Sequence, residues 1–277
     1  MILKKTSKLV IPVIIIVFLT ASFYQLLWGK LFPYSPVKIG FAKYDFPKVV
    51  VFAENGSAYY DYKTIDSLIS GVEIFHGLNF IRKPELLFFR DSNSYFQHSI
   101  TNARFYAYPN GSLVVSPWAV QEALDGKISI NIYLSHELSH TLLYQHMGFT
   151  VAYFFYPRWL LEGIAVYNTN QMGTSWYPSK EETYAYIRKG NFLPPEYFNT
   201  KREDEITLDV KYRTTFMYSE FACIVDYLIE SYGKEKFMQY MTQLLNSYQH
   251  NKTFRNVYGI DFETFLYNFK QHVNRHI

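Results

Sequence analysis

The chain has 277 residues, a formal net charge of +3 and a hydrophobic content of 49%. Its lysines and arginines are scattered, without a basic helix or stripe, so we expect no nucleic-acid partner. The length suits one domain with a sizeable core. The single cysteine, Cys223, rules out an intrachain disulfide, and its apolar neighbours indicate a buried, unreactive thiol.

The N-terminal segment predicts a membrane anchor. Residues 9–28 contain no charged side chain, and about 20 residues at 1.5 Å per residue span a hydrocarbon core of about 30 Å. Lysines within residues 1–8 favour a cytoplasmic N-terminus and an extracytoplasmic domain, although two lysines just beyond the segment weaken this asymmetry. A cleaved signal peptide is the alternative, with Thr20-Ala21-Ser22 as a weak cleavage sequence. Because the apolar run continues to Trp28, we favour an uncleaved, single-pass anchor in the cell membrane.

The remainder of the chain predicts an α+β fold. Residues 29–46 contain two prolines and are expected to tether the anchor to a domain at residues 47–277. Short β-branched and aromatic runs come first along the domain and apolar stripes of helical spacing come later. This order indicates a small, mostly antiparallel sheet followed by a mainly helical part. We expect strands at 49–52, 85–90, 104–109 and 112–116, and helices at 64–77, 134–147, 157–169, 214–231, 234–249 and 261–274.

Local signals set several of these boundaries. Asn110-Gly111 predicts a hairpin turn between the last two strands. Thr64 is the expected N-cap of the first helix and Gly77 its expected end. Gly148 should end the next predicted helix. The apolar run at 128–134 fits either a strand that enters this helix or the first turn of the helix itself.

The sequence His136-Glu137-Leu138-Ser139-His140 is the strongest functional signal in the chain. On a helix, residues four apart lie on one face, so both imidazoles can reach the same metal ion. Such a pair suits Zn²⁺, and Glu137 would lie beside the ion, where it can take a proton from a metal-bound water. The alternative is a structural helix whose histidines cap or pack. The apolar surroundings favour a metal, because buried polar groups must be paired or ligate an ion.

A third ligand is needed, and the sequence offers two candidates. His146 lies six residues after His140, but a helix that continues through Leu143 would point it away from the ion. Glu162 lies in the apolar stripe of the next predicted helix, where an unpaired carboxylate would be costly to bury. The small side chains around it would let the two helices approach closely. We favour Glu162, which leaves a fourth position open, as in catalytic zinc sites.

These two motifs resemble those of the gluzincin metallopeptidases, in particular the small bacterial peptidase MA-like families. The resemblance rests on Ser135-His-Glu-Leu-Ser-His140 followed by Trp159-Leu-Leu-Glu-Gly-Ile-Ala-Val-Tyr167, and it extends more loosely over residues 85–275. It implies a zincin-type domain with one Zn²⁺ per chain. It further implies that His136, His140 and Glu162 are the ligands and that Glu137 is the general base.

The expected function is hydrolysis of peptide bonds in a peptide or protein substrate by a membrane-anchored zinc enzyme. The resemblance implies that a tyrosine or histidine downstream of the third ligand stabilises the oxyanion, and Tyr218 is the candidate, with Tyr212 second. An extended substrate would pair with an edge strand, for which we select Leu113–Ser116. A catalytically silent binding module and a zinc hydrolase of a non-peptide amide are the alternatives.

Overall fold

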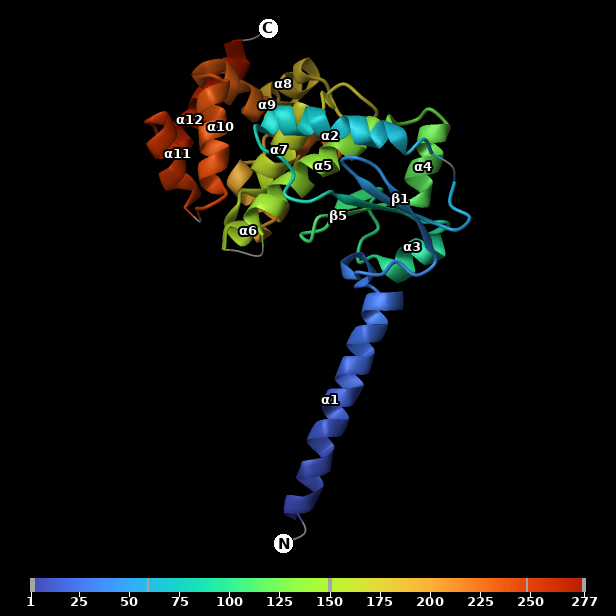
Figure 1. Cartoon of the computed structure of the whole chain (residues 1–277). Coiled ribbons are helices and arrows are strands. Elements are labelled where there is room, and N and C mark those ends of the chain that lie inside the picture. Colours follow the sequence, from blue (N-terminus) through green and yellow to red (C-terminus); the bar gives the residue numbers. More distant parts are fainter. Residues whose placement is uncertain (1–2, 59, 149–150, 248, 276–277) are drawn as a thin grey trace.

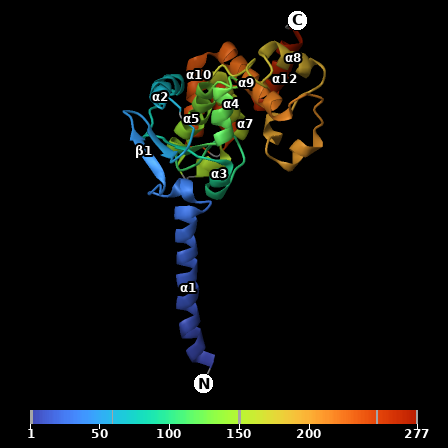
Figure 2. The ribbon, with the colours of Figure 1, turned by 90° about the vertical axis from the view of Figure 1, so that its right-hand side faces the viewer.

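The computed structural model describes residues 3–58, 60–148, 151–247 and 249–275. Helix α1 (Leu3–Trp28) projects alone from one side of a folded domain (Figures 1 and 2). Its large apolar side chains from Ile11 to Phe23 are exposed. The part Ile11–Trp28 is long and apolar enough to cross a membrane, a property that a signal sequence shares.

The segment after α1, within the expected tether of residues 29–46, packs onto the domain. It contains the short 3-10 helix η1 (Phe32–Tyr34) and strand β1 (Phe41–Asp45), which belongs to the sheet. Phe32 is fully buried. The buried amine of Lys38 donates hydrogen bonds to the carbonyls of Phe32, Pro33 and Ser35 at 3.2, 3.1 and 2.5 Å. These three bonds hold the turn of the short helix around one buried ammonium group.

The sheet has the order β1-β2-β3-β5-β4, with β2 at Val50–Glu54, β3 at Glu85–Phe88, β4 at Phe105–Ala107 and β5 at Ser112–Val115. It is mixed, so the expectation of a mostly antiparallel sheet was wrong. The pairs β1–β2 and β4–β5 are antiparallel, whereas β2–β3 and β3–β5 are parallel. The pair β2–β3 is parallel because α2 (Lys63–His76) returns the chain to the end of the sheet where β2 begins. After β3 the chain passes through α3 (Ser92–His98) and then runs back along β4, which is antiparallel to β5, so that β5 is again parallel to β3.

The helical part follows the sheet, as expected for an α+β chain. Helix α5 begins at Ile130, so the apolar run before Leu134 is the first turn of the helix and not a strand. The expected helix 234–249 ends early, and a separate helix, α11, follows it. The remaining helices are α4 (Pro117–Leu124), α5 (Ile130–Met147), α6 (Val151–Phe155), α7 (Arg158–Asn168), α8 (Lys180–Arg188), α9 (Arg213–Tyr232), α10 (Lys234–Leu244), α11 (His250–Tyr258) and α12 (Phe262–Arg275).

Local boundary signals were mostly read correctly. Gly77 ends α2 and Gly148 ends α5, both with positive φ, of 60° and 57°. The hairpin turn at Asn110-Gly111 joins β4 to β5. Thr64 is not the N-cap of α2, since the helix begins at Lys63 and the hydroxyl of Thr64 donates to the carbonyl of Asp61 instead.

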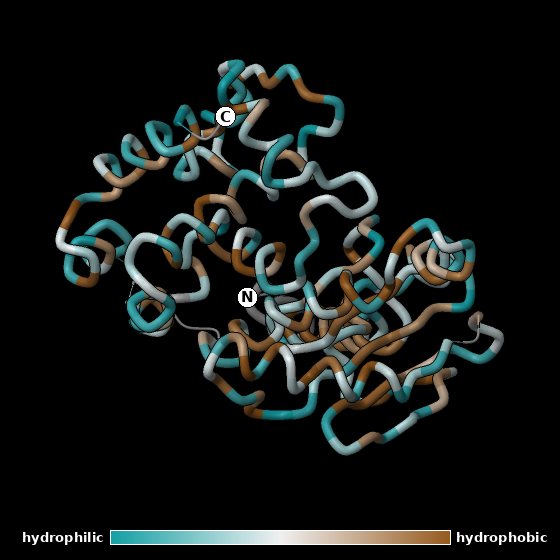
Figure 3. The backbone as a smooth tube through the Cα atoms, turned by 90° about the horizontal axis from the view of Figure 1, so that it is seen from above, coloured by the Kyte–Doolittle hydropathy of each residue, from teal (hydrophilic) through white to brown (hydrophobic). Residues whose placement is uncertain are grey.

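Helix α5 separates two hydrophobic cores. Leu134, Leu138 and Leu142 face the core beneath the sheet, whereas Leu143 and Met147 belong to the core of the helical part. Viewed from above, hydrophobic segments gather where the sheet meets the central helices (Figure 3). The helix is therefore buried on two sides, which places any polar group on it in a water-poor environment.

Candidate metal centre

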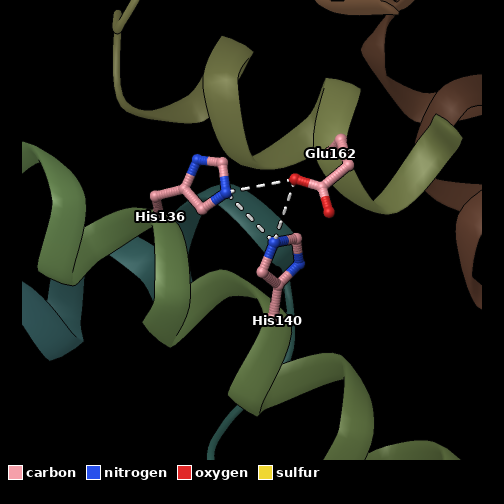
Figure 4. A group of neighbouring side chains, drawn as sticks. All are labelled: His136, His140 and Glu162. Atoms are coloured by element: carbon pink, nitrogen blue, oxygen red, sulfur yellow. Dashed lines mark hydrogen bonds and ion pairs between the residues drawn. The ribbon is translucent and has the colours of Figure 1, made fainter. Parts of the chain in front are cut away.

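His136 and His140 leave the same face of α5, as the four-residue spacing predicts (Figure 4). Their Nε2 atoms lie 3.1 Å apart, and the two residues are 5% and 6% exposed. Glu162 of α7 meets them from the neighbouring helix. Its Oε2 lies 3.3 Å from Nε2 of His136 and 3.5 Å from Nε2 of His140. These three side chains form a group that could hold a metal ion.

The position of Glu162 depends on the close packing of α7 against α9. A Cβ atom at Gly163 would lie only 2.7 Å from the carbonyl oxygen of Phe221 on α9. Only glycine therefore allows the two backbones to approach this closely. The buried residues Leu160, Leu161 and Ile164 hold the same helix in the helical core, so α7 presents Glu162 from a well-packed element.

Electrostatics at the group favour a carboxylate facing two imidazoles. Burial by itself raises the pKa of Glu162, but the charges of and hydrogen bonds from His140 and His136 outweigh it, and the pKa falls well below its usual range. Burial lowers the pKa of His136, yet the hydrogen bond to Glu162 and the charges of Glu137 and Glu162 reverse the effect and leave it raised. The site thus attracts positive charge.

Gln171 orients the first histidine. Its side-chain oxygen, in a fully buried residue, lies 2.9 Å from Nδ1 of His136. An amide oxygen can only accept, so Nδ1 carries the proton and the lone pair of Nε2 points to the centre of the group. Nδ1 of His140 is buried without a hydrogen-bond partner in the part of the chain that the structure describes. Nothing in the sequence pattern singles out Gln171, which lies in the loop after α7.

Glu137 lies beside the group and between α5 and the sheet. Its Oε2 accepts a hydrogen bond from the backbone N–H of Ala107 at 2.9 Å. Burial raises the pKa of the Glu137 carboxyl, and the negative charge of Glu162 adds to this effect, against the opposing charges of His136 and His140. A fixed carboxyl with a raised pKa is suited to exchange protons.

A cleft of about 360 Å³ opens onto these four side chains. One wall is the segment Ala103–Ala107, which includes β4, and the other carries Tyr144, Tyr177 and Tyr218. The ring of Tyr218 stacks over His136 at 6.4 Å and the ring of Tyr144 over His140 at 6.2 Å, measured between ring centroids. Burial, followed by the charge of Glu162, raises the pKa of Tyr218 well above its usual value, so its hydroxyl stays protonated.

The two other candidates from the sequence lie elsewhere. Tyr212 is 43% exposed and borders a separate hollow with Val210 and Lys211. The Nε2 atom of His146 lies 2.9 Å from the carbonyl oxygen of Asn79, on the outer side of α5. The structure thus brings Glu162 and not His146 to the two histidines, as the continuous helix predicts.

The strand beside the candidate site is β4, and the selection of Leu113–Ser116 as an edge strand was wrong. That segment forms β5, which pairs with β3 on one side and β4 on the other. Strand β4 is the edge. The backbone N–H and C=O groups of Tyr106 point toward β5. Because these groups alternate in direction along a strand, those of Phe105 and Ala107 point away from the sheet and toward the cleft.

Comparison with protein-family models gives no match, and comparison with curated proteins gives none either. The case for a function therefore rests on the residues of the site and on their geometry.

Proposed function

We propose that the protein is a membrane-anchored, zinc-dependent peptidase. In this proposal His136, His140 and Glu162 hold the ion and Glu137 is the general base. The proposal rests on one observation: these four side chains meet at a single cleft, and the edge strand β4 forms its opposite wall. Two histidines and a carboxylate with an open fourth position are the donor set of catalytic zinc sites.

The spacing of the donor atoms supports zinc. Ligands about 2.0–2.1 Å from an ion in tetrahedral geometry are roughly 3.3–3.4 Å from one another. The three separations in this group are 3.1, 3.3 and 3.5 Å. The contact from Gln171 to His136 supplies the outer hydrogen bond that ligating histidines usually make. A bound ion would also explain why two imidazoles and a carboxylate, which are costly to bury without a partner, lie side by side in the interior.

When bound, zinc would polarise the scissile carbonyl and make the attacking water more acidic. Glu137 accepts the proton of that water, while the N–H of Ala107 holds one of its oxygens and leaves the other for proton transfer. The same carboxyl then donates the proton to the departing amine. Tyr218, protonated and aimed into the cleft, donates a hydrogen bond to the developing oxyanion.

The edge of β4 supplies a way to bind the substrate backbone. An extended peptide can add to this edge through the outward-facing backbone groups of Phe105 and the carbonyl of Ala107, whose N–H is held by Glu137. The scissile bond would then lie beside Glu137, which already contacts Ala107. This arrangement favours a polypeptide over a compact small molecule as the substrate.

The substitution Glu137→Gln tests the proposal. The amide keeps the volume and leaves the three ligands in place, so the variant should remain folded and bind zinc. It cannot accept a proton, and loss of a general base lowers the rate by roughly 10²–10⁴-fold. We expect cleavage of an unbiased peptide library by the wild-type protein, by mass spectrometry, and none by the variant. Glu235→Gln, at an exposed position on α10, is the matched control and should cleave as the wild type does.

Two results would contradict the proposal. Equal cleavage by the wild type and Glu137→Gln would show that Glu137 is not the base. Zinc binding without cleavage by either protein would favour a binding module or a zinc hydrolase of a non-peptide amide.

A further inference from the structure

The connection between α1 and the domain is short and tightly packed, and we call it the junction. The ring of Phe32 packs against Phe41 and His98, with centroids at 5.1 and 4.5 Å. Gln97 of α3 donates a hydrogen bond to the carbonyl of Trp28, the last residue of α1, at 3.0 Å. Phe32 follows Trp28 by four residues, which span at most about 14 Å even when extended. If α1 crosses a bilayer, the base of the domain must lie at the lipid surface.

Exposed apolar side chains surround this junction, and we call them the collar. They come from the segment after α1, from the end of α3 and the loop behind it, and from α6, and each is between 42% and 68% exposed: Leu31, Val37, Phe96, Ile100, Phe154 and Phe155. Figure 1 shows α3 and α6 on the side of the domain from which α1 leaves. Water is a poor solvent for so many large apolar groups on one side, and a lipid surface next to the anchor would cover them.

The candidate cleft and the collar share a wall. Tyr106 of β4 lines the cleft and also a basal hollow that contains Lys30, Phe96 and Ile100. The turn after β4 is held to the junction, and the loop before β4 forms part of the cleft wall. Beyond the end of the strand, Asn110 donates a hydrogen bond to the carbonyl of Pro33 at 2.9 Å. Before its start, the loop that follows α3 enters the cleft wall at Ala103.

The opposite wall of the cleft also reaches the collar, through α6. The ring of Tyr153 packs against Tyr144 at 5.4 Å, and Tyr144 stacks over His140. Burial, and then the neighbouring Tyr153 and Tyr106, raise the pKa of Tyr34 in η1 to about 12. The ring of Tyr34 also packs against Tyr108 at 5.6 Å, and Tyr108 packs against Tyr106 of the cleft wall at 4.9 Å, so the junction is in contact with the wall of the cleft.

We propose that the collar rests on the lipid surface and that the cleft takes polypeptide strands anchored in the same membrane, within a few residues of their anchor. This inference rests on the proposed peptidase function and adds the class of substrate. The edge of β4 lies beside the junction and so at the level of the bilayer surface. A polypeptide segment that has just left the lipid can therefore reach the edge of β4 and pair with it as an extended strand.

The test uses the full chain in vesicles of phosphatidylcholine and phosphatidylglycerol. A randomised peptide library is joined to a transmembrane helix through spacers of about 5, 15 or 40 residues, which extend to at most about 3.5 Å per residue. Shared anchoring alone raises the effective concentration of any substrate, so the dependence on spacer length is decisive. We expect the shortest spacer to give cleavage about tenfold faster than the longest. A rate that rises with spacer length would place the cleft away from the lipid and overturn the inference.

A variant with Phe154→Ser and Phe155→Ser removes the most exposed part of the collar. It should keep its zinc and lose the preference for the shortest spacer. Ile74→Ser is the matched control, because Ile74 is 76% exposed on α2, at the far side of the domain from α1 (Figure 1). Its spacer preference should equal that of the wild type. An unchanged preference in the collar variant would contradict the lipid contact.

A second measurement is independent of activity. A polarity-sensitive fluorophore at Phe154→Cys should shift to the blue when the protein is in vesicles, whereas the same label at Ile74→Cys should not. The native Cys223 is fully buried and should not be labelled. No shift at position 154 would overturn the inference even if peptides are cleaved. Equal cleavage of anchored and free libraries would contradict the proposed class of substrate but not the peptidase proposal. Absence of all cleavage would contradict both the peptidase proposal and the proposed class of substrate, while the fluorophore would still test the lipid contact.

Discussion

At the scale of single residues, the cluster divides into groups that would touch a metal and groups that orient them. His136, His140 and Glu162 are expected to bind zinc directly, and His146 is not. Replacement of either histidine by alanine should abolish zinc binding, and Glu162→Ala should weaken it severely. His146→Ala, on the outer face of the same helix, should keep one zinc per chain. Metal analysis of the four purified variants identifies the ligands. Zinc loss only in His146→Ala would contradict the proposed ligand set.

Gln171 is expected to act through His136. Gln171→Leu removes the oxygen that fixes the proton on Nδ1, and loss of such outer contacts typically weakens metal affinity by about 10–100-fold. Competition with a chromogenic chelator measures the change. Gln145→Leu is the control, because Gln145 bonds to Arg82 at the far end of α5 and should leave the affinity unchanged. Equal affinities in all three proteins would assign Gln171 a packing role.

The sequence predicts the residues that depend on local periodicity. The spacing of His136 and His140 and the apolar stripe around Glu162 follow from helical geometry, which neighbouring residues determine. Gln171 could not be predicted in this way, since it lies in a loop whose path depends on packing around α7. The contact from Glu137 to Ala107 likewise joins residues 30 apart in the chain.

At the scale of elements, the errors were the direction of strand pairing and the choice of the edge strand. The hairpin of β4 and β5 was visible in Asn110-Gly111, but which strand pairs with β3 is decided by long-range packing. Parallel pairing next to β3 places β5 inside the sheet and leaves β4 at the edge. The short α3, with few apolar positions, gave no sign of the helix that separates β3 from the hairpin.

The close approach of α7 and α9 makes a prediction at the same scale. Gly163→Ala inserts a methyl group against the carbonyl of Phe221, and overpacking of this kind costs about 1–3 kcal/mol. The shift of α7 should also move Glu162 and lower zinc affinity. Gly71→Ala, in α2 with open space around it, should instead stabilise the fold by about 0.5–1 kcal/mol. Chemical denaturation with a parallel zinc titration measures both, and an unaffected Gly163→Ala would show that the helices can separate freely.

For the whole molecule, buried histidines should make stability depend on pH. Burial among aromatic rings lowers the pKa of His250 to about 4, below the value of about 6.5 of an exposed histidine. Below pH 6.5 the unfolded chain therefore binds a proton that the folded chain does not. The contribution to stability is complete above pH 6.5 and is lost as the pH falls toward 4, at up to about 1.4 kcal/mol per pH unit.

His250→Phe should reduce this dependence. Denaturation midpoints between pH 7 and 4, measured with a chelator present so that loss of zinc at low pH does not contribute, should fall less steeply in the variant. Parallel curves for the two proteins would show that His250 does not carry the effect.

Helix α5, which lines both hydrophobic cores, has a consequence for cooperativity. The two histidines lie on this shared helix, whereas Glu162 comes from a helix that belongs only to the helical core. An ion held by all three would join the shared helix to the helical core, in addition to the apolar contacts and the hydrogen bond between His136 and Gln171. Occupancy of the site and the order in which the halves unfold are then linked, because metal binding to a folded site adds directly to folding free energy. We therefore expect chelation to destabilise the helical part before the sheet.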